Sequence, residues 1–222
     1  MKKMTLRKRQ FTVWAGIIGP TLFVAIFTIE GWLRPGYDPL RMYVSALSLG
    51  PRGWIQMVNF IVFGALFLAF TGGVAAEFQT GKASRSGPIL LAIIAFCYLF
   101  SGPFVVDSAN QITVHGTLHG IFGGIVFLLM PISCFIFLRR FREDPRWQSL
   151  QWWTFGLGTI SAVAVVLLTI STKLPGIKNV FIDWFGLIQR AAIVPFMIWL
   201  FIFALGLCKR IKKSSVRGLR VD

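Results

Sequence analysis

The sequence is poor in charge, and especially poor in acidic residues. Only 14% of its 222 residues are charged, and 8 aspartates and glutamates stand against 23 lysines and arginines. A soluble domain of this size would carry about a quarter charged residues, whereas 55% of this chain is hydrophobic. These proportions exclude an ordinary soluble domain and favour a single membrane domain over residues 1–222.

Cysteine is also scarce, with three residues in the chain. Cys97, Cys134 and Cys208 lie in or beside apolar runs, and none has the spacing of a disulfide framework or a zinc knuckle. We therefore interpret them as small buried apolar side chains. Palmitoylation of Cys208 is the alternative, because two basic residues follow it.

Long apolar runs, in contrast, are abundant. A helix needs roughly 20 apolar residues to cross a bilayer, and six stretches qualify. They are residues 13–29, 54–75, 88–106, 118–137, 152–170 and 186–207. The first follows a basic start without a small-residue cleavage site, so we expect it to be retained as a membrane helix. The predicted fold is an all-α integral membrane bundle of six transmembrane helices.

Lysine and arginine are distributed unevenly between the connections. Seventeen of the 23 fall in the N-terminal tail, the 2–3 loop, the 4–5 loop and the C-terminal tail, and five fall in the other loops. The positive-inside rule then predicts that both termini are cytoplasmic, in a plasma membrane. The basic tails are expected to attract anionic lipids. The sequence has no nucleic-acid-binding motif, so no nucleic-acid partner is expected.

Ionisable residues on four predicted helices fall at a similar depth. Counted at about 1.5 Å per residue from the cytoplasmic end of each span, they lie about 26 Å away. They are Glu30, Asp107, His119 and Arg190. Because such groups usually face the bundle interior, we predict a polar cluster near the outer leaflet, with snorkelling to the headgroups as the alternative. Arg190 is expected to pair with Asp107 or Glu30, or to bind an anionic headgroup.

The first outer loop is predicted to carry a short interfacial helix. Asp38 followed by proline is typical of a helix start, and Gly50 followed by proline is typical of a helix end. At helical spacing, polar and apolar residues follow opposite faces. The polar face contains Asp38, Arg41, Ser45 and Ser48, and the apolar face contains Leu40, Tyr43, Val44 and Leu47. The polar face is expected to cover the polar cluster as a lid, or the helix serves as an anchor alone.

The chain has two histidines, His115 and His119, which stand one helical turn apart on one face. Two such histidines can reach one zinc ion, and the third ligand would be Asp107, Glu30 or Asp38. Hydrogen bonding across helices or to Asp107 is the alternative that we favour. The primary expectation is therefore no cofactor, with zinc as the second.

Glycines repeat beside the histidines at the same spacing of four. They are Gly116, Gly120 and Gly124. Small residues at this spacing let another helix approach closely. The stripe is predicted to serve packing within the bundle or contact in a homo-oligomer.

Three stretches and one aspartate carry a resemblance to a known family. They are PGYDPLRMYVSALSLGPRGWIQMVNFIVFG at residues 35–64, Asp107, HGTLHG at residues 115–120, and FLRRF after the fourth span. Together they resemble the domain-of-unknown-function 998 family of bacterial and archaeal multi-pass membrane proteins. The resemblance covers most of the chain. It implies a six-helix integral membrane protein without an established activity.

A second similarity concerns a serine, an aspartate and a His-xxx-His pair on membrane helices. The residues are Ser45, Asp107, His115 and His119. They are similar to those of the ceramidase and progestin-receptor-like membrane hydrolases, which implies a zinc site that cleaves lipid amides. The chain departs from that pattern because it has no third histidine and no seventh span.

These features favour a membrane protein that binds or carries a small molecule or lipid at the polar cluster. One alternative is a metal-dependent lipid hydrolase, in which His115, His119 and Asp107 would bind the metal. The other is a proton-coupled transporter with His119 and Asp107 as relay groups.

Overall fold

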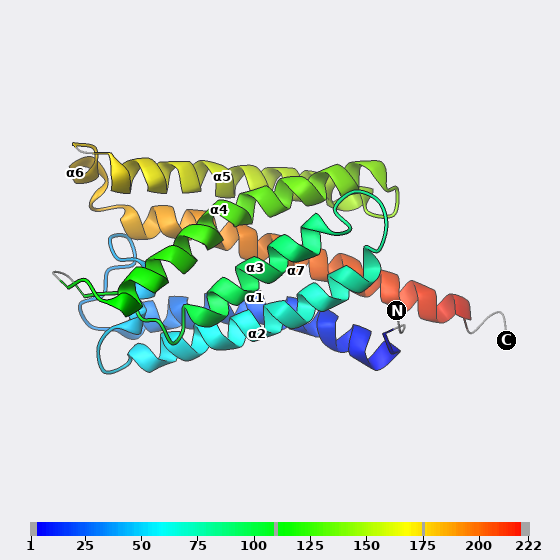
Figure 1. Ribbon diagram of the computed structural model, residues 1–222, viewed down its shortest axis with the longest axis horizontal. Helices are drawn as coiled ribbons and strands as arrows, with labels where there is room; N and C mark the ends of the chain where they lie inside the picture. Colours follow the sequence, from blue (N-terminus) through cyan, green and yellow to red (C-terminus); the bar gives the residue numbers. More distant parts are fainter. Residues whose placement is uncertain (1–3, 109–110, 175, 219–222) are drawn as a thin grey trace.

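The computed structural model describes residues 4–108, 111–174 and 176–218, and within them it contains helices, turns and extended segments but no strand. Six of the helices are long (Figure 1). They are α1 (Leu6–Leu33), α2 (Gly53–Glu77), α3 (Ser86–Phe100), α4 (Val114–Glu143), α5 (Gln151–Lys173) and α7 (Phe185–Gly218). The connections contain the short elements η1 (Val44–Ser48), η2 (Gln148–Leu150) and α6 (Lys178–Phe181). The predicted all-α class is confirmed.

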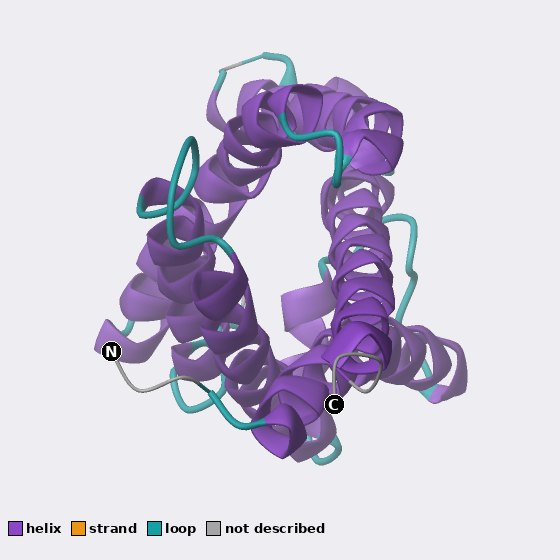
Figure 2. Cartoon of the chain, turned by 90° about the vertical axis from the view of Figure 1, so that its right-hand side faces the viewer, coloured by secondary structure: helices purple, strands orange, loops and turns teal. Residues whose placement is uncertain are grey.

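The six long helices form a closed ring (Figure 2). Each packs against the next in the order α1, α2, α3, α4, α5, α7, and α7 packs against α1. The start of α1 and the α2–α3 and α4–α5 connections lie at one end of the ring, at the right in Figure 1. We call it the basic end, because arginines gather there. We call the opposite end the pocket end, after the cavity described below.

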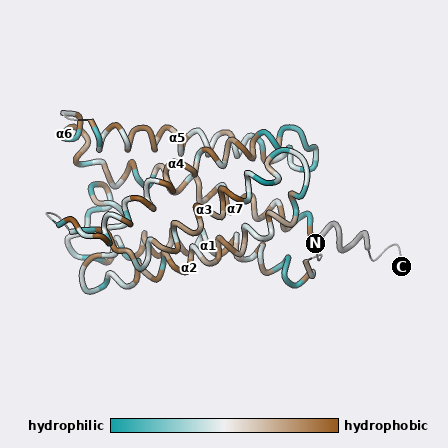
Figure 3. Tube along the Cα trace, in the orientation of Figure 1, coloured by the Kyte–Doolittle hydropathy of each residue, from teal (hydrophilic) through white to brown (hydrophobic). Residues whose placement is uncertain are grey.

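The apolar residues follow the helices, and the hydrophilic residues gather at the two ends (Figure 3). Among the described residues, five segments are long and apolar enough to cross a membrane. They are Leu6–Leu33, Gly53–Glu77, Val114–Glu143, Gln148–Lys173 and Phe185–Ile211. Prolines lie inside three of the long helices, at Pro20, Pro131 and Pro195.

The third predicted span, residues 88–106, needs a correction. Its helix, α3, has 15 residues and ends at Phe100, so that residues 101–106 form a turn and an extended segment. A helix of this length rises about 22 Å, which is less than the roughly 30 Å of a bilayer core. The physical reason is Pro103, which lacks an amide hydrogen and disfavours helical geometry at the residue before it. The Ser101 hydroxyl caps the end by donating to the Cys97 carbonyl over 2.8 Å.

The predicted interfacial helix in the first loop is also wrong in part. Residues 39–41 form a turn, and a short 3-10 helix, η1, follows at Val44–Ser48. Asp38 does accept the Leu40 amide over 2.9 Å, as a helix start would, but the helix does not continue. The Leu40 carbonyl instead accepts the Leu187 amide of α7 over 2.9 Å. The loop is therefore fastened to the end of the bundle.

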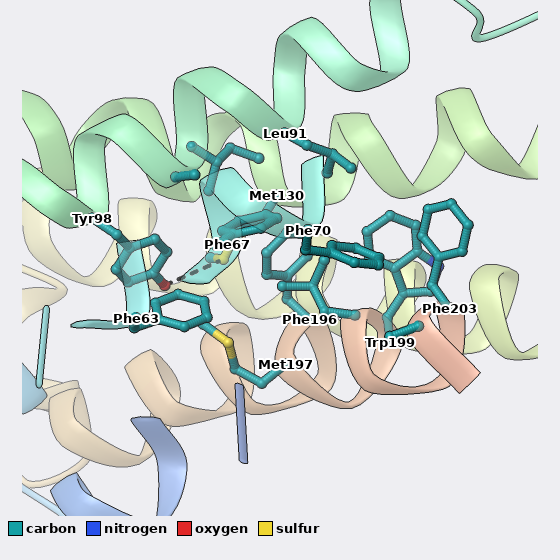
Figure 4. Close-up of a cluster of buried hydrophobic side chains, with 14 of the residues drawn as sticks. Phe63, Phe67, Phe70, Leu91, Tyr98, Met130, Phe196, Met197, Trp199 and Phe203 are labelled. Atoms are coloured by element: carbon teal, nitrogen blue, oxygen red, sulfur yellow. Dashed lines mark hydrogen bonds between the residues drawn. The ribbon is translucent and has the colours of Figure 1, made fainter. Parts of the chain in front are cut away.

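The interior of the ring is largely aromatic (Figure 4). The fully buried side chains include Phe23, Phe27, Phe63, Phe67, Phe70, Phe78, Phe137, Phe141, Trp147, Phe196, Trp199 and Phe203. The Tyr98 hydroxyl, buried among these rings, donates to the sulfur of Met130 over 3.8 Å. Because aromatic rings fill space efficiently, the core is tightly packed where they gather.

Candidate functional site

His119 lies near the start of α4 and turns into the bundle. It is 8% exposed, and its ring packs edge-on against Phe60 at a centroid distance of 5.9 Å. Its Nδ1 atom lies 2.7 Å from the carbonyl oxygen of Phe104. Because a carbonyl oxygen only accepts, Nδ1 carries the hydrogen, and in the neutral ring Nε2 keeps its lone pair. His119 can therefore accept a hydrogen bond through Nε2.

His115 has a different environment, although it stands one turn away. Its side chain is exposed, and its ring lies 5.4 Å from the ring of Phe104. Both histidines thus contact Phe104, one through the ring and the other through the carbonyl oxygen.

Asp107, the third predicted metal ligand, is engaged by the start of α4. Its carboxylate accepts the Thr113 amide over 3.1 Å and the Thr113 hydroxyl over 2.6 Å. These hydrogen bonds stabilise the charged form and lower the pKa of Asp107. Gly116 is required beside it, because a side chain there would collide with the Asp107 carboxylate. Among the described residues, no three His, Cys, Asp or Glu side chains are grouped to hold a metal ion.

Glu30 is the most deeply buried of the predicted acids. Its side chain pairs with Arg34 at 2.8 Å and with Arg52 at 2.6 Å. Arg34 also donates to the Leu49 carbonyl over 2.9 Å. A buried carboxylate needs such partners, because an unpaired charge away from water is very unfavourable. Glu30 therefore ties α1 to both ends of the first loop.

Arg190 does not pair with Asp107 or Glu30 as predicted, and this expectation is corrected. Its guanidinium donates to the carbonyl oxygens of Pro39, Met42 and Gly186 and to the Tyr37 hydroxyl, over 2.5–3.1 Å. A guanidinium presents several donors in a fixed plane, and here they match converging backbone oxygens. Arg190 holds the first loop on α7.

The remaining charged residues of the predicted cluster form a surface network. Arg41 lies 3.5 Å from Asp38 and 3.1 Å from Asp183, and all three side chains are exposed. The predicted residues thus lie at one end of the bundle but belong to separate networks. Glu30 pairs with arginines, Asp107 caps α4, and Arg190 holds the loop.

A cavity of about 340 Å³ lies at the pocket end, between η1, α2, α3, α4, α5 and α7. Two predicted residues, Ser45 and His119, line it. The other lining residues are Tyr43, Val44, Phe60, Tyr98, Ser101, Val106, Gly120, Gly123, Gly124, Val126, Phe127, Leu168, Thr172, Gln189 and Ile193. Most of these side chains are apolar, and a few polar groups stand among them.

Gln189 is the main functional candidate that the sequence did not identify. It is 8% exposed, and its Oε1 atom accepts the Val44 amide over 2.7 Å. The nearest sequence signal was the polar pair Gln189-Arg190 at the start of the last span. Thr172 and Ser101 could not be recognised from the sequence, because isolated serines and threonines are common in apolar helices. There the hydroxyl donates to the carbonyl four residues earlier, as both hydroxyls do here.

The glycine stripe needs a correction as well. A side chain added at Gly120 or Gly124 would meet no atom of the described residues within 4 Å. These glycines line the cavity instead of a tight helix contact, and both are exposed. Leu168 and Thr172 of the neighbouring helix α5 also line the cavity. A homo-oligomer through the stripe stays a prediction.

The helices and the cavity define a class of protein: a multi-pass membrane bundle with a partly apolar pocket near one end. The family described as "Protein of unknown function (DUF998)" matches residues 17–206, and the chain belongs to this family. The predicted resemblance is thereby confirmed. Neither the curated proteins nor the solved structures contain a match to the chain.

Proposed function

We propose that the chain is a six-pass protein of the plasma membrane with both termini in the cytoplasm. The unequal distribution of lysine and arginine supports this orientation, in which the basic end faces the cytoplasm. In this arrangement α3 crosses together with the segment at residues 101–106. The pocket end then lies at the outer leaflet.

We further propose that the cavity at the pocket end binds an amphipathic small molecule or lipid. The observation that carries this proposal is the cavity itself, about 340 Å³ with mainly apolar walls and a few polar groups. This volume falls within the roughly 300–1,000 Å³ of ligand pockets, which share that composition.

Two groups in the cavity are suited to a polar head. In the neutral ring, His119 offers Nε2 as an acceptor, because Nδ1 donates to Phe104. The Ser45 hydroxyl has no hydrogen-bond partner among the described residues. A ligand hydroxyl or amide can bond to both kinds of group. The apolar remainder of the ligand would contact Phe60, Phe127 and their neighbours.

We infer that the cavity opens sideways beside α4, towards the lipid, because Gly120 and Gly124 are exposed and line it. Gly120 and Gly124 leave the wall of α4 without side chains at the level of the cavity. An acyl or isoprenoid chain can extend through such an opening into the surrounding lipid. A strictly water-soluble ligand would gain nothing from it.

The test is to identify what the purified protein carries. Protein extracted in mild detergent is analysed by mass spectrometry for small molecules that remain bound after gel filtration. Gly123→Leu, which adds a side chain into the cavity, is expected to lower ligand occupancy about tenfold or more, as a filled pocket excludes its ligand. The control is Gly156→Leu on α5, where the added side chain also meets open space but lines no part of this cavity. Equal occupancy in both variants, or no retained ligand in the unaltered protein, would count against the proposal.

A further inference from the structure

A second cavity, of about 970 Å³, lies at the basic end. It is separate from the first cavity and shares no lining residue with it. Its wall contains both charged and small apolar residues. They are Met4, Arg9, Gly72, Ala75, Ala76, Glu77, Gln79, Thr80, Arg140 and Arg146.

The two carboxylates that pair with arginines of this cavity, Glu77 and Asp144, are each shared between two arginines. Glu77 pairs with Arg9 at 2.7 Å and with Arg210 at 3.0 Å. Both pairs leave the Glu77 side chain only 13% exposed. The acid is thus enclosed by its partners, and a ligand in the cavity meets the guanidinium groups more readily than the carboxylate.

Asp144 repeats this arrangement one turn beyond Arg140. It pairs with Arg140 at 3.0 Å and with Arg146 at 2.7 Å, and its side chain is 11% exposed. Four guanidinium groups therefore surround two carboxylates, and the region keeps two positive charges in excess. An anion in the cavity would offset this excess.

Several arginine donors have no acceptor among the described residues. The Nε atom of Arg140 is buried and unpartnered. The hydrogen bonds of Arg9 use Nη2, and those of the Arg146 side chain use Nε and Nη2, which leaves Nη1 of both residues. The Arg9 and Arg146 side chains are 30% and 55% exposed, so their Nη1 atoms are the donors that a ligand oxygen in the cavity can reach.

Arg140 is held in place before any ligand arrives. Its Nη1 atom donates to the Thr80 carbonyl over 2.9 Å, and its guanidinium lies 5.6 Å from the ring centre of Phe78. Gly81 makes this position available, because a side chain there would collide with Nη1. Gly81 also adopts a φ of 82°, a conformation that favours glycine. A fixed arginine binds an anion with less loss of side-chain entropy.

We propose that this cavity binds a phosphate ester, most directly the phosphate of an acidic phospholipid headgroup. Arginine donors match phosphate oxygens in charge and in geometry. The cavity lies where α1 begins and α2 and α4 end, at the level of lipid headgroups in the proposed orientation. The small residues Gly72, Ala75 and Ala76 of α2 leave room there for the glycerol and the first part of the acyl chains.

The experiment is a titration of delipidated protein in detergent, followed by native mass spectrometry. The probes are phosphatidylglycerol, phosphatidylcholine and glycerol 3-phosphate. We expect saturable binding of phosphatidylglycerol, at least about tenfold tighter than that of phosphatidylcholine, because only the former brings net negative charge. Glycerol 3-phosphate competing at equal concentration would assign the site to a soluble phosphate ester instead of a lipid.

Two double variants distinguish binding at this cavity from general electrostatic attraction of the lipid to the basic end. The double variant Arg9→Gln/Arg146→Gln removes two arginines of the cavity and leaves each carboxylate one partner, so we expect the bundle to stay folded. Binding of phosphatidylglycerol should weaken about tenfold or more. The matched control is Lys8→Gln/Arg142→Gln, which removes the same charge from exposed residues without ion pairs among the described residues. Equal weakening in both double variants would overturn the proposal.

Gly72→Leu provides a test that leaves every charge in place. Gly72 lines the cavity, and a side chain added there meets no described atom within 4 Å, so the change fills space without a clash. We expect it to weaken phosphatidylglycerol binding about tenfold, as the arginine variant does, and Gly156→Leu to leave binding unchanged. Undiminished binding in Gly72→Leu, checked by gel filtration for a folded protein, would overturn the proposal even if the arginine variants fail to fold.

Discussion

The two ends of this bundle share one ring of helices but differ in what fills it. On α4, the residues facing inward near the basic end are Phe137 and Phe141, both fully buried. Two to three turns from its other end, Gly120, Gly123 and Gly124 line a cavity. Along α4 the difference lies in side-chain volume, and at the pocket end α3 has also given way to the extended segment that contributes Val106 to the cavity. Inside a ring of helices, a cavity forms only where the inward-facing side chains are small.

The polar contacts of the two ends differ in the same systematic way. At the basic end, Glu77 and Asp144 are each held between two arginines. At the pocket end, Arg190 is held by backbone oxygens and by the Tyr37 hydroxyl, and Glu30 pairs with two of the three arginines of the first loop, Arg34 and Arg52. The basic end therefore keeps surplus cationic donors, whereas the pocket end leaves uncharged groups facing its cavity.

The largest loss of stability is expected from removing an aromatic ring from the core at the basic end. Phe203 is fully buried, and its ring contacts those of Phe70, Phe78, Phe137, Phe141, Trp147 and Trp199. Phe203→Ala should lower the free energy of unfolding by about 3–5 kcal/mol, because it opens a new void in a filled core. Thermal unfolding in detergent measures this change.

Phe60→Ala is the matched variant at the pocket end. Phe60 already borders the cavity, so its removal enlarges an existing space. We expect a smaller loss of stability than for Phe203→Ala. Equal losses from the two variants would show that the ends do not differ in packing.

The second prediction compares one substitution at two glycines. A side chain at Gly87 of α3 would lie 2.6 Å from the ring of Phe137, whereas one at Gly124 meets no described atom within 4 Å. Gly87→Leu should destabilise the protein by about 1–3 kcal/mol through overpacking. Gly124→Leu should leave stability unchanged or raise it by about 0.5–1 kcal/mol, since leucine favours a helix more than glycine does.

Melting temperatures of the two glycine variants in the same detergent provide the measurement. The comparison fails if Gly124→Leu unfolds as early as Gly87→Leu. That result would mean that another surface, such as a second copy of the chain, packs against Gly124. It would then favour the predicted homo-oligomer.

The apolar runs were sufficient to predict where the helices lie, but not where they end. Hydropathy does not register polar helical turns, so α1 begins at Leu6, well before the predicted residue 13. The end of α3 was available in the sequence, because Pro103 marks it, but the apolar residues after it extended the predicted span. The first loop could not be predicted, since its helix gives way to bonds with the distant residue Leu187.

For the site, counting residues along each span predicted that the ionisable residues lie at the same end of the bundle. It did not predict the direction in which each side chain points. Depth is one coordinate, and whether two groups meet also depends on their angle around the helix axis. The partners of Arg190 are backbone oxygens, which leave no trace in residue identity. The spacing of Gly120 and Gly124 showed a small-residue face but could not show that the space beside it is open.

The smallest effect is expected for the change of stability in acid. It distinguishes an aspartate held by arginines at the basic end from one held by neutral groups at the pocket end. The hydrogen bond and charge of Arg146 lower the pKa of Asp144 from its ordinary value of 3.8 to about 2. A pKa lowered in the folded state stabilises the protein above pH 4, and this contribution is lost as the pH falls from 4 towards 2. Asp144→Asn should therefore lower the melting temperature by about 2–4 °C at pH 6 and flatten its decline in acid.

Asp107 at the pocket end has the same sign but another cause, because Thr113 hydrogen bonds lower its pKa. Added salt screens charge pairs more than hydrogen bonds to neutral groups. In 0.5 M NaCl, the effect of Asp144→Asn should therefore shrink, whereas that of Asp107→Asn should persist. Melting curves from pH 6 to pH 2.5 at two salt concentrations give the measurement. If salt changes both variants alike, Asp144 is not held mainly by its arginines, and the electrostatic contrast between the ends is wrong.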